Sequence, residues 1–256
     1  MKRLVPIRRS LLVNLLLVIL LLSGAILATT VFEARQVIQS LSASVINQTM
    51  QEVEARLQRF FDPATRGLQM ARSWGNAGLL DEENPAELTD VFAPLIQQFP
   101  QVSSLMVSDE RGREYMLLRT TEKWLNRQIQ PDQWGKRALW VEWINHRSEA
   151  REFWEDLDYD PRVRPWYREA IRKSDTNLTA THWTKPYKFF TTKDPGITAS
   201  TTFDVGDGLQ RVIGFDILLK DISTFTLNLQ VSSNGKTFVL TDDNRIIGLP
   251  RDERFI

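Results

Sequence analysis

The chain opens with a long apolar run behind a short basic segment. No charged residue occurs from Ser10 to Phe32, and residues 11–22 are almost wholly aliphatic. An uncharged run of this length can cross a hydrocarbon core about 30 Å thick as a helix. The preceding basic residues are Lys2, Arg3, Arg8 and Arg9. Because positive charge favours the cytoplasmic side, the pattern predicts a cytoplasmic segment over residues 1–9, a transmembrane helix over residues 10–32 and export of the rest.

The same apolar run is open to a second interpretation, a signal peptide cleaved after Ala28. Such a site needs small residues, and Ile26 is a poor match at one of the required positions. The apolar run is also long for a signal peptide. The favoured prediction is therefore an uncleaved membrane anchor.

An amphipathic pattern follows the membrane segment. Its apolar residues recur at steps of three and four: Leu41, Val45, Ile46, Met50, Val53, Leu57 and Phe60. This spacing predicts a long helix over residues 33–61 that continues the membrane helix and ends near Asp62-Pro63. There, a capping residue followed by proline predicts the start of a second helix, through about Trp74. The apolar stripe has two interpretations that can both hold, a homodimer and signalling contact or a cover for one side of its own domain.

The pattern then changes from helical spacing to a period of two. Asn84-Pro85 predicts a third helix through Phe99, with a kink at Pro94. The residues predicted to face inwards from this helix are Leu88, Val91, Leu95 and Ile96. The strands predicted after it span residues 102–108, 113–120, 138–144, 181–189, 197–203 and 209–218, with a turn at 109–112 and a short helix over 163–173. Helices followed by an antiparallel meander indicate an α+β domain with one central antiparallel sheet.

Helical spacing resumes over residues 221–231, and a hairpin is predicted from strands at 236–241 and 245–248. The chain is long enough for one good-sized domain or two small ones.

Composition excludes several classes of function. Lys plus Arg and Asp plus Glu number 32 each, and no dense basic stripe with interleaved aromatic residues occurs, which argues against nucleic-acid binding. The absence of cysteine excludes disulfides, thiolate metal sites and a thiol nucleophile. The two histidines, His146 and His182, lack the spacing of a metal site or a catalytic triad. The acidic run over residues 155–160 lacks the glycine turn of a calcium loop and is expected to be a solvated loop. The sequence predicts no cofactor, no metal site and no enzymatic activity for this segment.

One nine-residue stretch, from Tyr159 to Tyr167, carries the most chemical information. It places a guanidinium, an indole and two phenols close together, and two prolines restrict its backbone. Arg164 offers a planar fork of donors that suits a carboxylate. Trp166 adds one N–H donor and a large apolar face. These groups suit a small anion in a partly dry pocket, although an ion pair of Arg164 with the acidic run and core packing of Trp166 are the simpler alternatives.

The spacing of Tyr159, Arg164 and Trp166 resembles the ligand motif of double Cache domains. These are extracytoplasmic sensor modules of bacterial chemoreceptors, sensor histidine kinases and cyclases. The stretch Thr184-Lys185-Pro186-Tyr187 resembles the next ligand strand of the family, and residues 212–217 resemble the strand that carries its acidic residue, here Asp216. The resemblance covers roughly residues 33–256.

The resemblance implies a PAS-like, membrane-distal ligand-binding subdomain over residues 62–230 and the start of a second, membrane-proximal one over 231–256. It implies an inner-membrane protein with a periplasmic domain. The remaining residues are too few to close a second sheet, so a fragment of a longer receptor or a single-module relative is expected.

The resemblance also implies roles for five residues around a closed, ligand-sized hollow. Arg164, Trp166 and Tyr187 would hold the carboxylate end of a ligand, with Tyr159 and Asp216 near the other end. Asp216 would face the cavity and hold an ammonium group, while its two neighbours face the other way. The amino-acid-binding members carry an acidic residue two positions after the strand tyrosine, and this chain has Phe189 there. The ligand class therefore stays open among amino acids, amines and organic acids.

Three hypotheses follow for function. The first is a membrane-anchored sensor that binds a small carboxylate-bearing solute and transmits a conformational signal through the membrane. The second is a ligand-free dimerisation or partner-docking scaffold whose cavity is filled by its own side chains. The third, an anchored envelope enzyme, has the least support and would need a histidine–carboxylate pair around His182.

Overall fold

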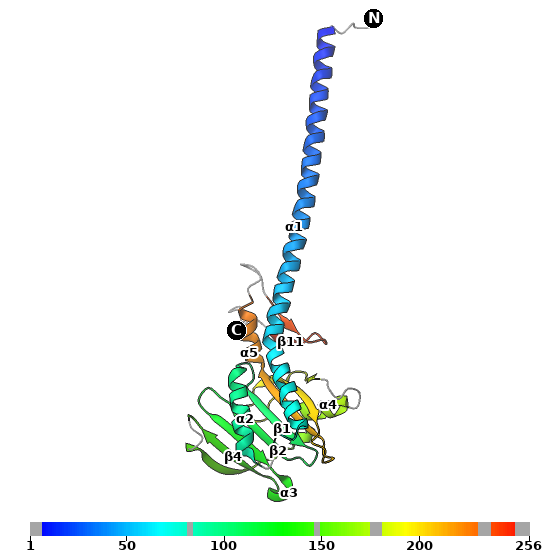
Figure 1. Cartoon of the computed structure of the whole chain (residues 1–256). Coiled ribbons are helices and arrows are strands. Elements are labelled where there is room, and N and C mark those ends of the chain that lie inside the picture. Colours follow the sequence, from blue (N-terminus) through cyan, green and yellow to red (C-terminus); the bar gives the residue numbers. More distant parts are fainter. Residues whose placement is uncertain (1–6, 81–83, 146–148, 175–180, 230–236, 249–256) are drawn as a thin grey trace. The chain divides into compact units, whose positions relative to one another are not determined.

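The computed structural model describes residues 7–80, 84–145, 149–174, 181–229 and 237–248. The chain divides into two compact units, residues 1–55 and residues 56–256. Helix α1 (Ile7–Asn76) provides most of the first unit and begins the second (Figure 1). In the first unit, α1 contains an 18-residue window with a mean hydropathy of 2.8 and no buried residue. By length and composition, α1 can cross a membrane, as the sequence predicted for residues 10–32.

The predicted helix break at Asp62-Pro63 is wrong. Pro63 lies inside α1, and the helix continues to Asn76. A proline in a helix interior costs about 3 kcal/mol. The turns that follow bury Ala64, Leu68 and Ala71 completely, and burial of a single leucine contributes about 1.5–3 kcal/mol. This packing offsets the cost of the proline.

Helix α2 (Pro85–Gln98) agrees with the predicted third helix. Leu88, Leu95 and Ile96 are buried as predicted, but Val91 is 37% exposed and Phe92 is the fully buried residue instead. The assignment of Val91 was wrong because the four positions chosen span a wider arc of the helix than the sheet covers.

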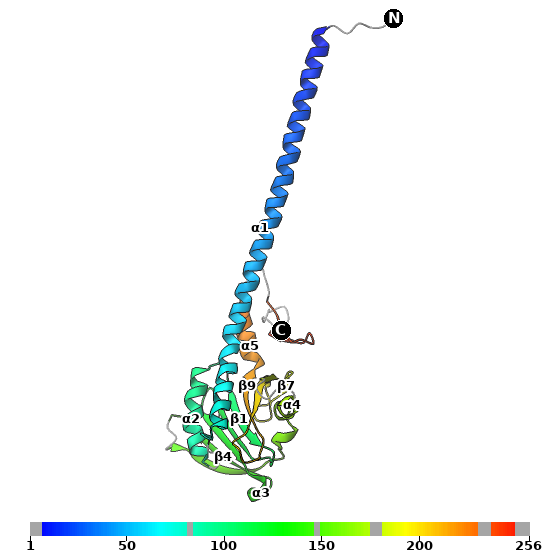
Figure 2. The ribbon, with the colours of Figure 1, turned by 45° about the vertical axis from the view of Figure 1, so that its right-hand side comes forward.

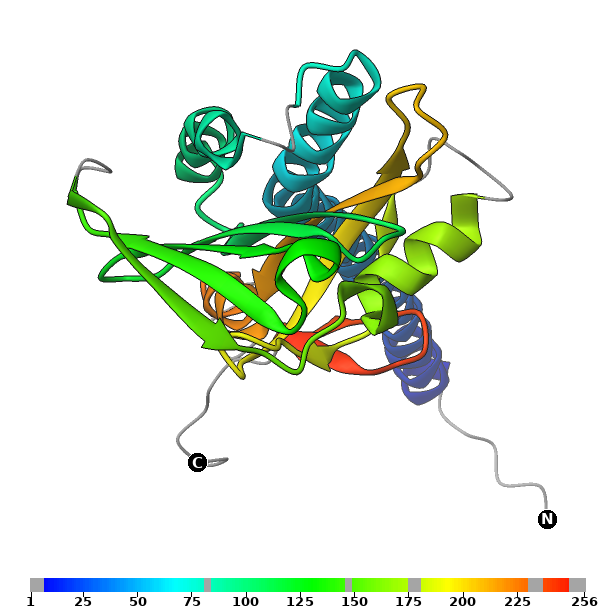
Figure 3. The same ribbon diagram turned by 90° about the horizontal axis from the view of Figure 1, so that it is seen from below.

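The second unit contains one nine-stranded antiparallel sheet (Figure 3). The strand order is β5-β4-β3-β2-β1-β9-β8-β6, and β7 also pairs with β8. The strands are β1 (Ser104–Asp109), β2 (Glu114–Arg119), β3 (Trp124–Ile129), β4 (Arg137–Trp143), β5 (Arg151–Asp156), β6 (His182–Trp183), β7 (Tyr187–Lys188), β8 (Pro195–Phe203) and β9 (Arg211–Leu218). The α+β class with one central antiparallel sheet is thereby confirmed.

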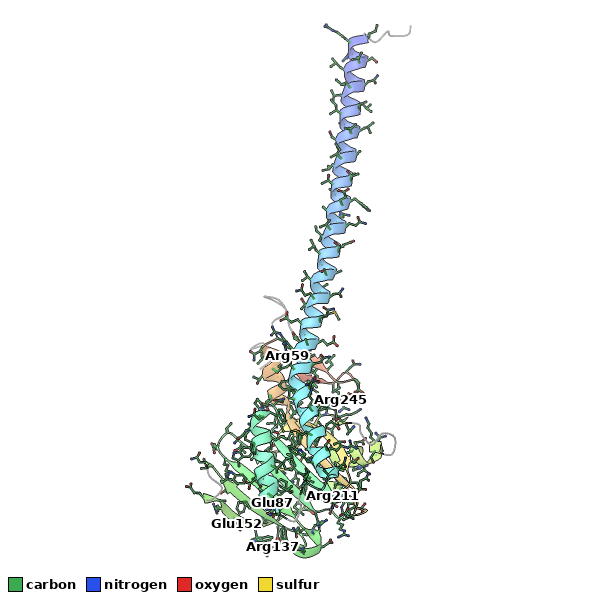
Figure 4. All side chains as sticks on the ribbon, in the orientation of Figure 1. Arg59, Glu87, Arg137, Glu152, Arg211 and Arg245 are labelled. Carbon is green, nitrogen blue, oxygen red and sulfur yellow. The ribbon has the colours of Figure 1, made fainter. Side chains whose placement is uncertain are left out.

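Two strands escaped prediction from the sequence. Strand β3 buries Asn126 and Arg127, so its polarity hid its position inside the sheet. Strand β5 includes the first part of the acidic run expected to be a loop, and its side chains, such as Glu152, are mostly exposed at the sheet edge (Figure 4). The predicted strand over 181–189 is divided into β6 and β7, since Pro186 between them has no N–H to donate to a neighbouring strand.

Helices cover both faces of this sheet. On one face, α1 and α2 pack over a large apolar cluster that includes Leu68, Phe92 and Phe215. On the other face, α4 (Pro165–Ser174) lies along β8 and β9 (Figure 2). There, Trp166 and Tyr167 pack with Met106 and Met116. The short helices α3 (Pro131–Trp134) and η2 (Pro161–Val163) lie in connections.

The last described elements are α5 (Leu219–Leu227), β10 (Val239–Leu240) and β11 (Ile246–Gly248). Strands β10 and β11 pair antiparallel, which agrees with the predicted hairpin. Residues 230–236 and 249–256 lie outside the described part of the chain, as does the N-terminal part of the predicted cytoplasmic segment. The second, membrane-proximal subdomain therefore stays a prediction.

Candidate ligand-binding site

One cavity on the α4 side of the sheet brings all five predicted residues together. Tyr159, Arg164 and Trp166 come from the segment around η2, and Tyr187 and Asp216 come from β7 and β9. The remaining lining is mostly supplied by β1, β2, β3 and the connection after β7. Residues up to 57 positions apart in the chain thus meet at one place, as the resemblance implied.

Arg164 is half-buried at this cavity and has no ionic partner among the described residues. Its Nη2 donates a hydrogen bond to the Lys188 carbonyl oxygen at 2.9 Å. Its Cζ lies 6.0 Å and 5.5 Å from the ring centroids of Tyr159 and Tyr187. The alternative ion pair with the acidic run does not form within the described chain, and Asp160 of that run is paired with Arg162 instead. A cation that faces two phenols and one neutral carbonyl is a good site for an anion.

Trp166 serves the core and the cavity together. The residue is 1% exposed, and its backbone carbonyl accepts a hydrogen bond from Ser200 at 2.9 Å. Within the described residues, no group accepts a hydrogen bond from its indole N–H. The core-packing alternative is therefore correct for the ring, while the indole N–H is left as a donor beside Arg164.

Asp216 lies at the end of a chain of hydroxyl groups. Its two carboxylate oxygens accept hydrogen bonds from Thr198 Oγ1 at 2.5 Å and from Ser104 Oγ at 2.7 Å. The Thr198 hydroxyl is 2.6 Å from the Tyr187 hydroxyl. Because the single hydroxyl proton of Thr198 goes to Asp216, Tyr187 is the donor to Thr198. Tyr187 and Asp216 are therefore linked through one hydroxyl.

Burial controls the protonation of these groups. It raises the pKa of Asp216 to about 6, and the hydrogen bonds from Thr198 and Ser104 oppose this rise. Burial also raises the pKa of Tyr187 well above its ordinary value. The neighbours of Asp216, Phe215 and Ile217, are fully buried on the opposite face of β9, as predicted.

A buried ion pair beside the cavity was missed by the sequence analysis. Arg127 Nε and Nη2 lie 2.9 and 2.7 Å from Glu114 Oε2, and both side chains are at most 1% exposed. The Tyr159 hydroxyl donates to Glu114 Oε1 at 2.8 Å, and its ring lies 4.2 Å from Arg127 Cζ.

The electrostatic surroundings of Arg127 and Glu114 keep Arg127 charged. Burial lowers the pKa of Arg127, but Glu114 and Tyr159 together outweigh burial, so the net pKa is raised. Burial, followed by the Glu114 charge, raises the pKa of Tyr159 well above its ordinary value. Glu114 lies on the same inward face of β2 as Met116 and Leu118. A carboxylate on an inward face needs a buried cation as its partner, and this pattern in the sequence could have predicted the ion pair.

The cavity is nearly filled by protein side chains. Its volume is about 20 Å³, which is room for about one water molecule. Phe189 is 6% exposed and packs edge-on against Tyr187, with ring centroids 5.2 Å apart. Phe190 packs on Tyr159 at 4.6 Å. The expected ligand-sized hollow is therefore filled by rings of the connection between β7 and β8.

His182 does not form the pair that an enzyme would need. It is 7% exposed, and both its ring nitrogens are buried without a hydrogen-bond partner among the described residues. Burial, followed by the nearby charge of Lys173, lowers its pKa. His146 lies outside the described residues. Among the described residues, no three or more His, Cys, Asp or Glu side chains cluster in a way that could hold a metal ion.

Comparisons with known proteins identify a family. A family model described as "Methyl-accepting chemotaxis protein-like, first PDC sensor domain" matches residues 92–224, which include all five predicted site residues. Over 96 residues, the chain is 29% identical to the methyl-accepting chemotaxis protein McpC of Bacillus subtilis. Over 94 residues, it is 31% identical to McpG of Pseudomonas putida. These alignments cover 38% and 36% of this chain but only 14% of each relative.

A solved structure with a similar fold is the ligand-binding domain of the Pseudomonas fluorescens chemoreceptor CtaA in complex with L-serine. The TM-score is 0.51 at 18% identity, and the alignment covers 79% of this chain and 69% of the other. At this identity, the likeness establishes the fold alone. It agrees with the α+β architecture described above.

Proposed function

Because the chain belongs to the family of methyl-accepting chemotaxis protein-like first PDC sensor domains, we propose that it is the sensor part of a membrane-anchored receptor that binds a small carboxylate-bearing solute. One observation carries this proposal. Five residues from separate segments line a single cavity, and the guanidinium of Arg164 there has no carboxylate partner among the described residues. A partly buried guanidinium without an ionic partner favours an anionic ligand, because the ligand would compensate its charge.

The proposed pose follows from the donors and acceptors on the two sides of the cavity. The ligand carboxylate takes the place of the Lys188 carbonyl at Arg164 and also accepts from the Trp166 indole N–H. The opposite end of the ligand meets Asp216, which is bonded to two hydroxyl donors and to no cation in the described chain. An ammonium group would complete this carboxylate, and the L-serine complex of CtaA supports an amino acid within the proposed class.

The proposed signal passes through the long helix. Helix α1 carries the apolar window and supports an anchor in the bacterial inner membrane with the sensor on the periplasmic side. Binding acts as a signal when the solute favours one arrangement of a helix pair over another, a coupling of about 1–3 kcal/mol. A homodimer through residues 33–61 would provide such a pair. The methyl-accepting relatives support chemotaxis as the output of the whole receptor.

The test is a thermal-shift screen of the full chain in detergent against amino acids, amines and organic acids. A carboxylate-bearing compound should raise the melting temperature, and Arg164→Ala should lower its affinity by about 2–5 kcal/mol, because the ligand charge loses its partner. Arg168→Ala, at an exposed position of α4, removes the same charge away from the cavity and is the matched control. Equal stabilisation of both variants would refute the role of Arg164.

One observation favours the ligand-free scaffold as a second candidate. The cavity volume of about 20 Å³ is too small for an amino acid without movement of Phe189 or Phe190. If the cavity is a permanently filled core, no compound in the screen raises the melting temperature. The two candidates are therefore separated by the same experiment.

A further inference from the structure

Both phenols of the cavity donate their protons to other groups of the protein. The Tyr159 hydroxyl donates to Glu114 Oε1 at 2.8 Å. The Tyr187 hydroxyl lies 2.6 Å from Thr198 Oγ1 and donates to it, because the single proton of Thr198 goes to Asp216. A phenol whose proton is used in this way can only accept a hydrogen bond from a bound solute.

The cavity therefore has a donor end and an acceptor end. The donors are the Arg164 guanidinium and the Trp166 indole N–H. The acceptors are the Asp216 carboxylate and the Tyr187 hydroxyl, both of which belong to residues of the lining. We call Asp216, Thr198 and Tyr187 the hydroxyl relay, since Thr198 joins the two acceptors.

Thr198 holds its place behind the cavity. It is fully buried and does not line the cavity. The Thr184 N–H donates to the Thr198 carbonyl oxygen at 3.0 Å, and the Thr184 hydroxyl accepts from the Thr198 N–H at 2.9 Å. These two contacts fix the backbone of Thr198 but leave its hydroxyl to the relay. That hydroxyl has one proton, so its direction sets what Tyr187 offers to the cavity.

Protonation of Asp216 reverses the hydroxyl relay. A carboxyl group with a proton on Oδ1 becomes the donor to Thr198 Oγ1. The Thr198 proton then turns to the Tyr187 oxygen, and the Tyr187 proton turns away from Thr198, towards the cavity that Tyr187 lines. One proton from solvent is added to Asp216, while the two hydroxyl groups only rotate. Tyr187 thereby changes from an acceptor to a donor.

The same proton changes the charge of the cavity. Burial raises the pKa of Asp216 to about 6, so this group titrates just below neutral pH. The titratable and charged groups that face Asp216 are Glu114 of β2, Arg164 ahead of α4 and Tyr187 of β7. Glu114 is paired with Arg127, and Arg164 stays charged at any of these pH values. Loss of the Asp216 charge therefore leaves Arg164 uncompensated, which favours an acid without an ammonium group.

We propose that the hydroxyl relay makes the ligand class of this cavity depend on pH. With Asp216 charged, Asp216 and Tyr187 accept from the ammonium group of an amino acid whose carboxylate lies on Arg164. With Asp216 protonated, Tyr187 donates to the carbonyl oxygen of a 2-oxo acid whose carboxylate lies on Arg164 as before. This inference rests on the proposed sensor function. It adds the chemistry of the ligand's second group, and it places the Tyr187 hydroxyl with Asp216, whereas the resemblance implied the carboxylate end.

The experiment compares matched ligands on the full chain in detergent by isothermal titration calorimetry at about pH 5 and about pH 7.5. L-alanine is paired with pyruvate and L-valine with 3-methyl-2-oxobutanoate, since each pair exchanges an ammonium group for an oxo group. We expect the affinity ratio of oxo acid to amino acid to rise about tenfold on acidification in at least one pair. The ratio cancels effects of pH on the fold as a whole, because both ligands meet the same protein.

Two results would overturn the inference. In the first, the ratio rises by less than about threefold or falls, while binding still depends on Arg164; the sensor proposal then stands. In the second, no compound of either pair binds at either pH. The wider screen of amines and other organic acids then decides on the sensor proposal separately.

Thr198→Val tests the hydroxyl relay itself. The substitution keeps the side-chain shape and the backbone contacts to Thr184 but removes the hydroxyl. Asp216 still titrates but no longer turns Tyr187, so the rise in the ratio should shrink several-fold. Thr226→Val is the matched control, since Thr226 is 2% exposed on α5 and bonds only to the Ile222 carbonyl among the described residues. A full rise in Thr198→Val would assign the effect to charge alone and overturn the relay.

Asp216→Asn tests the origin of the pH dependence. Its side chain is neutral at both pH values, so the affinity ratio should no longer change with pH. A ratio that still rises on acidification in Asp216→Asn would place the titrating group elsewhere and overturn the inference.

Discussion

The two faces of the sheet use the same strands for opposite chemistry. On the face below α1 and α2, β9 contributes Ile213, Phe215 and Ile217, each fully buried in an apolar cluster. On the other face, the same strand contributes Asp216 to the cavity. Some charges on that face are paired, as Arg127 is with Glu114, while Arg164 has no ionic partner among the described residues. One face therefore stabilises the fold by burial of apolar area, while the other holds desolvated polar groups around the cavity.

The largest expected loss of stability comes from a substitution in the apolar face. Phe215→Ala should lower the free energy of unfolding by about 3–5 kcal/mol, because a fully buried ring leaves a cavity behind. Chemical denaturation followed by circular dichroism measures the change. A loss below about 1 kcal/mol would show that the cluster collapses around the missing ring.

The next largest loss of stability comes from a substitution in the polar face. Arg127→Met alone should cost about 3 kcal/mol of stability, since the Glu114 carboxylate would be buried without its partner. Arg127→Met combined with Glu114→Gln should recover most of that loss. The difference between the single and double variants in a denaturation series isolates the penalty of the unpaired charge. Equal stability of the two would contradict a desolvated pair.

A smaller effect on stability is expected from the titration of Asp216 on the polar face. The pKa of Asp216 in the folded chain, about 6, lies above its ordinary value, so the folded state binds its proton more tightly than the unfolded state. Stability is therefore favoured at about pH 4 and falls by about 2–3 kcal/mol as pH rises through 6.

The Asp216→Asn variant provides the control, since it should lose this part of the pH dependence. Thermal unfolding of both proteins between pH 4 and 7 measures the contribution. Parallel curves for the two proteins would show that Asp216 does not titrate in this window.

The smallest expected effect lies at the edge of the apolar face. Val91→Thr should change stability by less than about 0.5 kcal/mol, because Val91 is 37% exposed on the outer side of α2. Phe92→Leu, one position later and fully buried, is the contrasting variant and should cost more than 1 kcal/mol by the same measurement. Similar losses for both would place Val91 in the core after all.

The sequence was most informative where each strand has one apolar face. Strands β1, β2, β8 and β9 alternate or are continuously apolar, and their pairing brought Asp216 to the cavity as expected. The five candidate residues could be named because they follow a spaced motif. Their role as ligand contacts stays a prediction.

Strand β3 and the buried ion pair were missed for one physical reason, which is that their polar residues were taken as exposed. In β3, Asn126 is buried because its amide donates to the Met116 carbonyl at 2.8 Å. Arg127 is buried because Glu114 lies on the neighbouring strand. Such compensation depends on a partner that is distant in sequence, so a local pattern cannot reveal it. The continuation of α1 past Pro63 was missed for a related reason, since the packing that offsets the cost of this proline is tertiary.

Strand β9 separates the cavity on one face of the sheet from the apolar core on the other. Asp216 and Phe215 are joined by a single peptide unit, and the ring of Phe215 lies against α1 at Gly67. A Cβ on that glycine would lie 2.5 Å from the ring of Phe99 and 3.3 Å from the ring of Phe215, so both rings are packed tightly against the helix. We expect a solute that shifts Asp216 to shift the ring of Phe215 on the opposite face as well, where that ring contacts α1.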